Sequence, residues 1–310
     1  LGIVVPQQHY KNPEEIIRDA DIAMYQAKQK GSGNIVLFNN QMYEETLSRM
    51  EIENSLRRAI DRKEFEVYYQ PFYMLNGDQL AGFEALIRWN HPQRGLLLPM
   101  DFLSIAEETG LIVPIGNFVL QQACAQMQAW EIEFPPAKNW IISVNLSPRQ
   151  LITNKLADHI RVVLKETELE PHKLWLEITE NAIIQNIDDV RTQLEQIRDL
   201  GVRIKIDDFG TGYSSLSYIR DLPIDGLKID RSFIGDLSNG NQQIVRSMLN
   251  LGHDLGLVQV AEGVETETQR EYLRSLNCDY IQGFLMSKPI PASKTTALIR
   301  STVTRDPHPV

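Results

Sequence analysis

Short β-rich segments alternate with helical segments from about residue 65 onward, and this alternation constrains the fold more than any other feature. Segments such as "KLWLEITE", "VRIKIDDF" and "VQVAEGVE" are rich in β-branched and other apolar residues and read as strands. The helices expected between the strands lie at 101–109, 116–131, 148–166, 186–200, 240–255 and 266–276. Such alternation predicts parallel strands joined by right-handed crossovers.

Eight expected strands predict an α/β fold, a (β/α)₈ TIM-like barrel whose first strand is irregularly paired. A doubly wound open sheet is the alternative. In its dinucleotide-binding form that fold carries a glycine-rich phosphate loop after the first strand, and the sequence has none there.

A separate helix is predicted ahead of the alternating region, at residues 12–31. Asn12 can cap it, Pro13 suits its first position, Glu15 completes a capping box, and Gly31 suits a left-handed C-terminal position. A short strand at 34–38 follows. This piece is too small to bury a core by itself.

The chain is therefore expected to divide into four parts. These are a small N-terminal unit at 1–39, a polar connecting helix at 40–65, the barrel at 66–297 and a C-terminal tail at 298–310. The first residues read as half a strand and begin without Met, so we expect a fragment of a longer protein, which leaves membrane anchoring of that parent open.

Composition indicates a soluble globular protein, with 43% hydrophobic and 23% charged residues. The net charge of −10 disfavours nucleic acid and anionic membrane as partners of this chain. Cys124 and Cys278 lie far apart, which favours buried thiols and a reducing, cytoplasmic compartment. No apolar run reaches the roughly 18 residues of a membrane span, and the N-terminus lacks the features of a signal peptide.

Polar side chains fall at the expected ends of seven consecutive strands. They are Glu84, Asn145, Glu177, the pair Asp207 and Asp208, Lys228, Glu262 and Gln282. Barrel enzymes carry their chemistry at these strand ends, so the side chains should surround one cleft. Crowded carboxylates repel one another unless cations neutralise them. Oxygen donors without His or Cys select Mg²⁺, Mn²⁺ or Ca²⁺ over Zn²⁺.

The adjacent aspartates suggest a two-metal site. One carboxylate can bridge two cations about 3.5–4 Å apart, an arrangement suited to in-line attack of water on a phosphodiester. Lys228 could orient or deprotonate the water or stabilise phosphate charge, or it could simply form a structural ion pair with an aspartate. The glycines of "GTGYSS" would let the following loop approach the metals and rearrange.

Residues from about 50 to 297 resemble the EAL domain family of cyclic-di-GMP phosphodiesterases. The resemblance rests on "FEALIRWNHP", "FLSIAEETGLI", "SVNLSPRQL", "LEITE", "DDFGTGYSSLSYIRDLPIDGLKIDRSFI", "VAEGVET" and "YIQGF", which occur in the family's order and spacing. It implies a (β/α)₈ barrel with one irregular strand and hydrolysis of cyclic-di-GMP to linear pGpG. Phe284 and Ile219 are mild departures from the family's usual Tyr and Leu.

The resemblance also implies a metal-binding set. One metal would have four ligands, Glu84, Asn145, Glu177 and Asp207. Asp207 and Asp208 would share the second metal. The expected ions are two Mg²⁺ or Mn²⁺ per site, with Ca²⁺ inhibitory.

The other site roles follow from the same resemblance. Lys228 and Glu262 would lie by the attacking water, together with Glu84 as a catalytic group. Arg88 would pair with a substrate phosphate. Two glutamines, Gln70 and Gln282, would line the substrate groove and help hold the site.

Regulation is implied by the resemblance as well. Glu180 would anchor the "DFGTGYSS" loop, and a homodimer would form through the face near that loop. Residues 1–39 resemble the C-terminal end of a GGDEF (diguanylate cyclase) domain through "ADIAMYQAKQKGSGN". Because the GGDEF signature itself is absent, no cyclase activity is expected of this chain. We interpret the segment as inert in preference to regulatory. A silent cyclic-di-GMP receptor and a protein-interaction scaffold are the competing functions.

Overall fold

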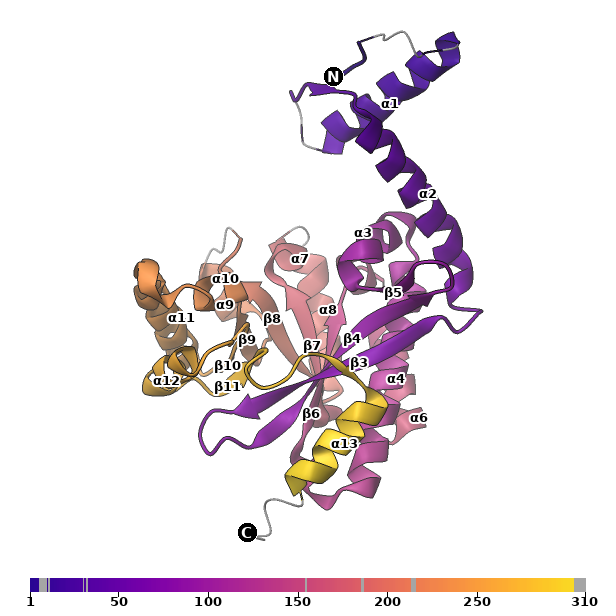
Figure 1. The fold of residues 1–310 in the computed structure, drawn as a ribbon. Coiled ribbons are helices and arrows are strands. Elements are labelled where there is room, and N and C mark those ends of the chain that lie inside the picture. The colour runs from indigo at the N-terminus through magenta and orange to yellow at the C-terminus, as the bar shows by residue number, and fades with distance from the viewer. Residues whose placement is uncertain are drawn as a thin grey trace.

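The computed structural model describes residues 1–5, 10, 12–29, 31, 33–153, 155–184, 187–212 and 216–303. Within these residues, eight strands close into a barrel that forms the body of the molecule (Figure 1). The barrel strands are β3 (Phe65–Met74), β4 (Leu80–His91), β6 (Ile141–Leu146), β7 (Leu174–Thr179), β8 (Arg203–Phe209), β9 (Gly226–Ile229), β10 (Val258–Ala261) and β11 (Tyr280–Gln282).

The order of the strands confirms the predicted barrel. From β4 through β6, β7, β8, β9 and β10 to β11, each strand pairs in parallel with the next. Strand β3 is the irregular one, because it runs antiparallel to both of its neighbours, β4 and β11. Its two sets of hydrogen bonds join the first and last parallel strands and leave the barrel without an open edge.

Helices cover the outside of the barrel. The larger ones are α3 (Pro99–Thr109), α4 (Ile112–Glu133), α6 (Leu156–Thr167), α8 (Ile187–Asp199), α11 (Gln242–Asp254), α12 (Glu267–Ser275) and α13 (Ala292–Val303). Helix α4 shows why they pack there: Leu120, Cys124 and Met127 recur at helical spacing and are fully buried. The thiol of Cys278 is buried as well, as predicted.

One predicted helix is wrong, because the segment at 148–166 forms two helices, α5 (Pro148–Leu151) and α6. Helix α5 has its own capping box, in which Ser147 and Gln150 bond each other's backbone N–H groups. Several short elements were not predicted. They are β5 (Gly95–Leu97), α7 (Glu180–Ile184), α9 (Leu216–Asp221), α10 (Arg231–Ile234), β12 (Ile290–Pro291), the 3₁₀ turns η1 (Pro135–Asn139) and η2 (Pro171–Lys173), and the π turn η3 (Leu237–Asn241).

Helix α13 extends across residue 297, where the sequence suggested that a tail begins. Its Ile299 is fully buried, and the Thr296 hydroxyl accepts a hydrogen bond from Trp130 Nε1 at 2.9 Å. The described residues after 297 therefore pack on the barrel.

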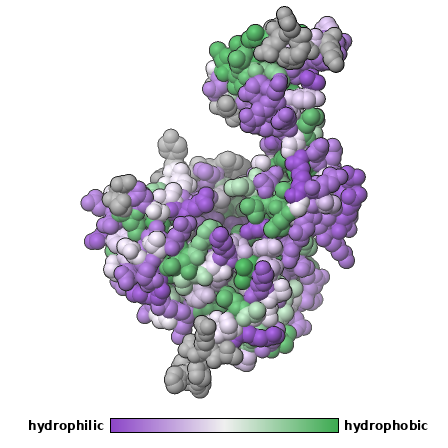
Figure 2. Space-filling view, in the orientation of Figure 1, coloured by the Kyte–Doolittle hydropathy of each residue, from purple (hydrophilic) through white to green (hydrophobic). Residues whose placement is uncertain are grey.

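A small unit stands apart from the barrel at the N-terminus (Figure 1). It contains β1 (Gly2–Ile3), α1 (Pro13–Gln29) and β2 (Val36–Leu37), with β1 and β2 paired in parallel. Its apolar cluster is formed by Ala23, Ala27 and Val36 and is separate from the barrel core. Hydrophobic residues also gather on its outer surface (Figure 2).

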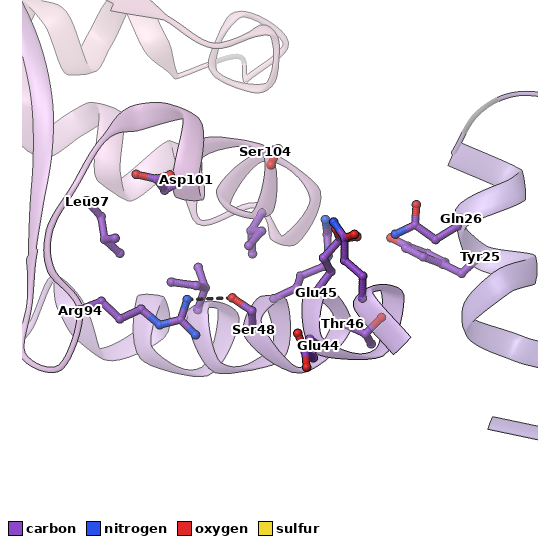
Figure 3. Close-up of a pocket in the computed structure, with 14 residues that line it drawn as sticks. Tyr25, Gln26, Glu44, Glu45, Thr46, Ser48, Arg94, Leu97, Asp101 and Ser104 are labelled. Atoms are coloured by element: carbon purple, nitrogen blue, oxygen red, sulfur yellow. Dashed lines mark hydrogen bonds between the residues drawn. The ribbon is translucent and has the colours of Figure 1, made fainter. Parts of the chain in front are cut away.

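Helix α2 (Asn40–Ala59) connects the two parts, and its last turns bury Ile52, Leu56 and Ala59 in the barrel core. Arg94, in the turn between β4 and β5, donates to Ser48 Oγ at 2.7 Å (Figure 3). It also pairs with Glu51 at 2.6 Å. Among the described residues, no helix is long and apolar enough to cross a membrane.

Candidate active site

A cavity of about 610 Å³ opens at the C-terminal end of the barrel strands. Carboxylates of Glu84, Asp207 and Glu262 line its floor. The rim carries three cationic side chains, Arg88, Arg231 and Lys288, and three apolar ones, Leu96, Leu98 and Phe284. The cavity therefore combines an acidic floor with a cationic and apolar rim, which suits a ligand that bears both phosphates and flat rings.

Strand register brings the predicted polar residues together. Asn145 lies beside Glu177 on the neighbouring strand, and Gln70 lies beside Glu84. The expectation that every member ends its strand is wrong for Glu84. Strand β4 pairs in parallel with β6 only over Gly82–Ala85 and then continues outward to His91, paired with β3 and β5. Glu84 still reaches the site, because the parallel pairing of β4 within the barrel ends at Ala85, one residue after Glu84, although the strand itself continues.

The amine of Lys228 lies at the centre of the carboxylates. Its Nζ is 2.7 Å from Glu177 Oε2, 3.3 Å from Asp207 Oδ1 and 3.4 Å from Glu84 Oε2, and it also pairs with Glu262. Burial acts to lower the pKa of Lys228, but the surrounding carboxylates outweigh burial and raise this pKa well above its ordinary value. The carboxylates therefore favour the charged form of the amine.

The carboxylates differ in how strongly they hold a proton. Burial raises the pKa of Glu84 and of Asp207, and it raises the pKa of Glu262 to about 8. Glu177 behaves in the opposite way: two lysines, Lys205 and Lys228, overcome its burial and lower its pKa to about 2. Glu177 is thus ionised, whereas Glu84, Asp207 and Glu262 either hold protons or need further cations to stabilise their negative charge.

A β-bulge turns both adjacent aspartates toward the same side. Neighbouring residues in a regular strand face opposite sides of the sheet. Here the pairing of β8 with β9 shifts between Ile206 and Phe209, and Asp208 has φ of 54°. As a result, carboxylate oxygens of Asp207, Asp208 and Glu262 lie within 4.8 Å of one another.

Amide side chains fix Glu84 from two directions. Gln282 Nε2 donates to Glu84 Oε2 at 2.6 Å and to Gln70 Oε1 at 3.1 Å. Asn145 Nδ2 donates to Glu84 Oε1 at 2.7 Å. The carboxylate is thereby held in place across the line where the barrel closes.

The donor chemistry fits hard divalent cations. The predicted ligands offer carboxylate and amide oxygens, which Mg²⁺ and Mn²⁺ prefer. His91, the only histidine near an expected strand end, uses Nδ1 to accept N–H groups of Gln93 and Arg94 at 3.2 and 3.3 Å. It does not line the cavity.

Comparison with protein families gives a match over residues 53–289 to the model described as the EAL domain. The chain belongs to the EAL domain family. Over 301 residues it is 42% identical to the bifunctional diguanylate cyclase/cyclic di-GMP phosphodiesterase MucR of Pseudomonas aeruginosa, covering 96% of this chain and 44% of that protein. It is 37% identical over 303 residues to the cyclic di-GMP phosphodiesterase NbdA of the same organism, covering 97% of this chain and 38% of NbdA.

The chain thus spans less than half the length of these two curated relatives. Among solved structures, it resembles the PaMucR phosphodiesterase in its c-di-GMP complex, with a TM-score of 0.76 and 45% identity over 79% of this chain and 99% of that one. It also resembles the EAL enzyme Bd1971 bound to cAMP and cyclic-di-GMP, with a TM-score of 0.79 and 29% identity over 94% of this chain and 77% of that one.

Glu180 lies beside the bulge of this EAL domain, at the start of α7. Its Oε2 accepts the backbone N–H of Gly210 at 3.1 Å. The second half of the loop predicted to rearrange, residues 213–215, lies outside the described residues. The contact ties α7 to the backbone two residues after Asp208.

Three cations in or beside the site were missed from the sequence. Arg231 and Lys288 lie far from the strand-end acids in sequence, and only the fold brings them to the rim. Lys205 could have been found by counting, because it precedes Asp207 by two residues, and side chains two apart on a strand share a face.

Proposed function

We propose that this EAL domain hydrolyses cyclic-di-GMP to linear pGpG with the help of two divalent cations, Mg²⁺ or Mn²⁺. The observation that carries the proposal is the bulge that turns Asp207 and Asp208 toward Glu262 at the floor of the cavity. A two-metal site is the arrangement that best suits phosphodiester hydrolysis. The names of MucR and NbdA support the same reaction class.

The rim supports cyclic-di-GMP as the substrate. Three cations line the cavity in a protein whose net charge is −10, and they can pair with the phosphates of a ligand. The guanidinium of Arg88 is buried against the ring of Tyr68 at 5.2 Å and can pair with a phosphate. Leu96, Leu98 and Phe284 offer apolar surface to the bases.

The metal ligands are proposed as the sequence predicted them. Glu84, Asn145, Glu177 and Asp207 would hold one cation, and Asp207 and Asp208 would share the other. When bound, the two cations supply charge stabilisation to the phosphoryl oxygens and lower the pKa of water.

Lys228 and Glu262 would act on the attacking water. The surrounding carboxylates raise the pKa of Lys228, which favours a role as a hydrogen-bond donor that orients the water or stabilises charge on a phosphoryl oxygen. Glu262, whose pKa burial raises to about 8, can accept the proton of the water once its own proton has been lost. The water oxygen then bonds to phosphorus, the bond from phosphorus to the 3′ oxygen breaks, and the 3′ oxygen leaves and takes a proton from solvent to become a hydroxyl.

Gln70 and Gln282 would keep Glu84 and the groove wall in place, as their hydrogen bonds support. We also propose that residues 1–39 are the end of a GGDEF domain, that 40–65 connects it to the barrel domain at 66–297, and that 298–310 follows the domain. A homodimer through the face beside the loop anchored by Glu180 completes the proposal.

Product chromatography tests the function. The purified protein is incubated with cyclic-di-GMP and Mg²⁺ or Mn²⁺, beside Glu84→Gln and the exposed-acid control Asp158→Asn. We expect pGpG from the wild type and Asp158→Asn, none from Glu84→Gln, and inhibition by Ca²⁺. Nucleotide binding without any product would establish a receptor and overturn the proposal. If heat stability also failed to respond to divalent cations, the scaffold function would be favoured.

A further inference from the structure

A second buried lysine lies in the barrel beneath the proposed metal ligands. Lys205 is 1% exposed and is the register partner of Glu177 on the adjacent strand. Its Nζ lies 2.8 Å from Glu177 Oε1. Lys205 is not among the described residues that line the cavity, so it does not reach a substrate directly.

The ammonium group of Lys205 is held on several sides. Its Nζ donates to Ser143 Oγ at 2.9 Å. It also lies over two aromatic rings, 4.9 Å from the centre of Trp175 and 5.3 Å from the centre of Phe72. Hydrogen-bond acceptors and ring faces both stabilise a cation.

Gly226 leaves the room that the lysine stem occupies. A Cβ on Gly226 would lie 3.1 Å from Lys205 Cγ and 2.7 Å from the carbonyl oxygen of Val258. The neighbouring strand therefore carries a glycine at the register position facing the lysine. The position of the Lys205 side chain is thus determined by the packing of the neighbouring strands.

The two oxygens of Glu177 are divided between two lysines. Oε1 forms an ion pair with Lys205 at 2.8 Å, whereas Oε2 contacts Lys228 among the other carboxylates. Oε2 is therefore the oxygen that lies with the other proposed metal ligands. The charge of Lys205 also offsets one of the site's acids from within the protein, which opposes the binding of further cations.

We propose that Lys205 is a positioning residue that restricts Glu177 to one metal-binding oxygen, so that the ligands keep a catalytic geometry. Through its positive charge, it also lowers the affinity of the site for divalent cations. This role rests on the proposed two-metal hydrolysis. Lys205 acts on the reaction through Glu177 and the metals alone.

Lys205→Met tests the role because it keeps the length of the side chain and removes the charge. We expect this variant to bind Mn²⁺ roughly threefold or more tightly, since a nearby positive charge is gone. Its kcat should fall roughly tenfold or more, because Glu177 is free to turn, while KM for cyclic-di-GMP changes less than about twofold. Mn²⁺ binding is measured without substrate, from the electron paramagnetic resonance signal of the free ion.

Two variants accompany it. Lys205→Arg keeps the cation and should restore the Mn²⁺ affinity of the wild type. Lys173→Met is the matched control, because Lys173 is also buried and pairs with a glutamate, Glu131, at 2.9 Å outside the site. The control should change neither Mn²⁺ affinity nor kcat.

Unchanged Mn²⁺ affinity and kcat in Lys205→Met would overturn the proposal, and so would weaker Mn²⁺ binding by this variant. If Lys205→Met does not fold, Ser143→Ala replaces it. That variant removes one hydrogen bond to the cation and should lower kcat while leaving Mn²⁺ affinity unchanged; a kcat equal to that of the wild type would overturn the proposal. If the wild type binds Mn²⁺ but makes no pGpG, the proposed function fails, whereas the affinity measurements still decide the role of Lys205.

Discussion

Asp208 owes its position to its backbone as much as to its carboxylate. A φ of 54° places it in the left-handed region, which Asp and Asn tolerate better than other side chains that carry a Cβ. The Thr211 hydroxyl donates to the Asp208 carbonyl oxygen at 2.8 Å and supports the bend. Backbone shape and metal-binding charge can therefore be separated by mutation at this residue.

Asp208→Asn should keep the bulge and lose the reaction. We expect kcat to fall roughly 100-fold or more, because one ligand charge is removed, and the free energy of unfolding to stay within about 1 kcal/mol. Asp208→Val should lose as much activity and also about 1–2 kcal/mol of stability, because a β-branched residue is strained at this φ. Urea unfolding and pGpG assays measure both; activity within twofold of wild type in Asp208→Asn would contradict the assignment.

Glu262 should make metal binding depend on pH. Burial raises the pKa of Glu262 to about 8, so below that pH the carboxyl is protonated and a cation must displace the proton. Mn²⁺ affinity should therefore rise with pH, by up to about tenfold per unit below pH 8, and level off above it. Titration calorimetry in buffers of different ionisation enthalpy counts the released proton. Glu262→Gln should reduce the release, and Glu84 and Asp207, whose pKa values burial also raises, should account for what remains. Release equal to that of the wild type would show that Glu262 does not titrate.

At the scale of elements, the short helix α7 is joined to the bulged end of β8. Glu180 is 5% exposed, and its Oε2 bonds Gly210 N–H. A Cβ on Gly212 would lie 2.6 Å from Glu180 Oε1, so the backbone passes close to this carboxylate. Helix and loop are thus packed together immediately after the two aspartates.

Glu180→Ala should lower kcat with little effect on the fold. Release of the backbone after Asp208 misplaces the metal ligands, and displacements of about 1 Å cost up to about 100-fold in rate. Glu180→Gln keeps an acceptor and should lose less. Gly212→Ala is an independent test, since its added Cβ would push Glu180 away. Steady-state pGpG formation measures all three, and full activity in Glu180→Ala would exclude the anchoring role.

The sequence predicted the strands and helices in which apolar side chains recur at regular spacing. It failed where contacts between distant segments determine the structure. Strand patterning located the barrel and the inward-facing acids. The helix predicted at 148–166 is interrupted between Leu151 and Leu156, and the helical pattern on both sides concealed the break. Lys205 lies between two isoleucines, and its two-residue spacing from Asp207 places it on the same face as that acid. Its pairing with Glu177 follows from strand register, which no local pattern contains.

For the molecule as a whole, the N-terminal unit and the barrel have separate cores. The cluster of Ala23, Ala27 and Val36 does not include residues of the barrel, whereas the end of α2 is part of the barrel core. The contacts of α2 with the turn at Arg94 are on the surface. Surface ion pairs contribute little, typically about 1 kcal/mol or less.

A chain that begins at residue 40 should therefore keep the barrel. We expect its main unfolding temperature to stay within about 4 °C of that of the full chain, with pGpG formation unchanged within about twofold. A chain that begins at residue 61 lacks Ile52, Leu56 and Ala59 and should lose much more stability. Calorimetry compares the three chains. A large loss in the first truncation would show that residues 1–39 support the barrel.

Closure of the barrel by β3 has a consequence for synthesis on the ribosome. Gln282 bonds both Gln70 and Glu84, and it follows Gln70 by 212 residues. The hairpin of β3 and β4 can form early, because its contacts are local, but its other edge waits for β11. A nascent chain consequently exposes the edge of β3 and carries half-assembled ligands until nearly the whole domain has emerged. The cell gains no phosphodiesterase from an interrupted translation product.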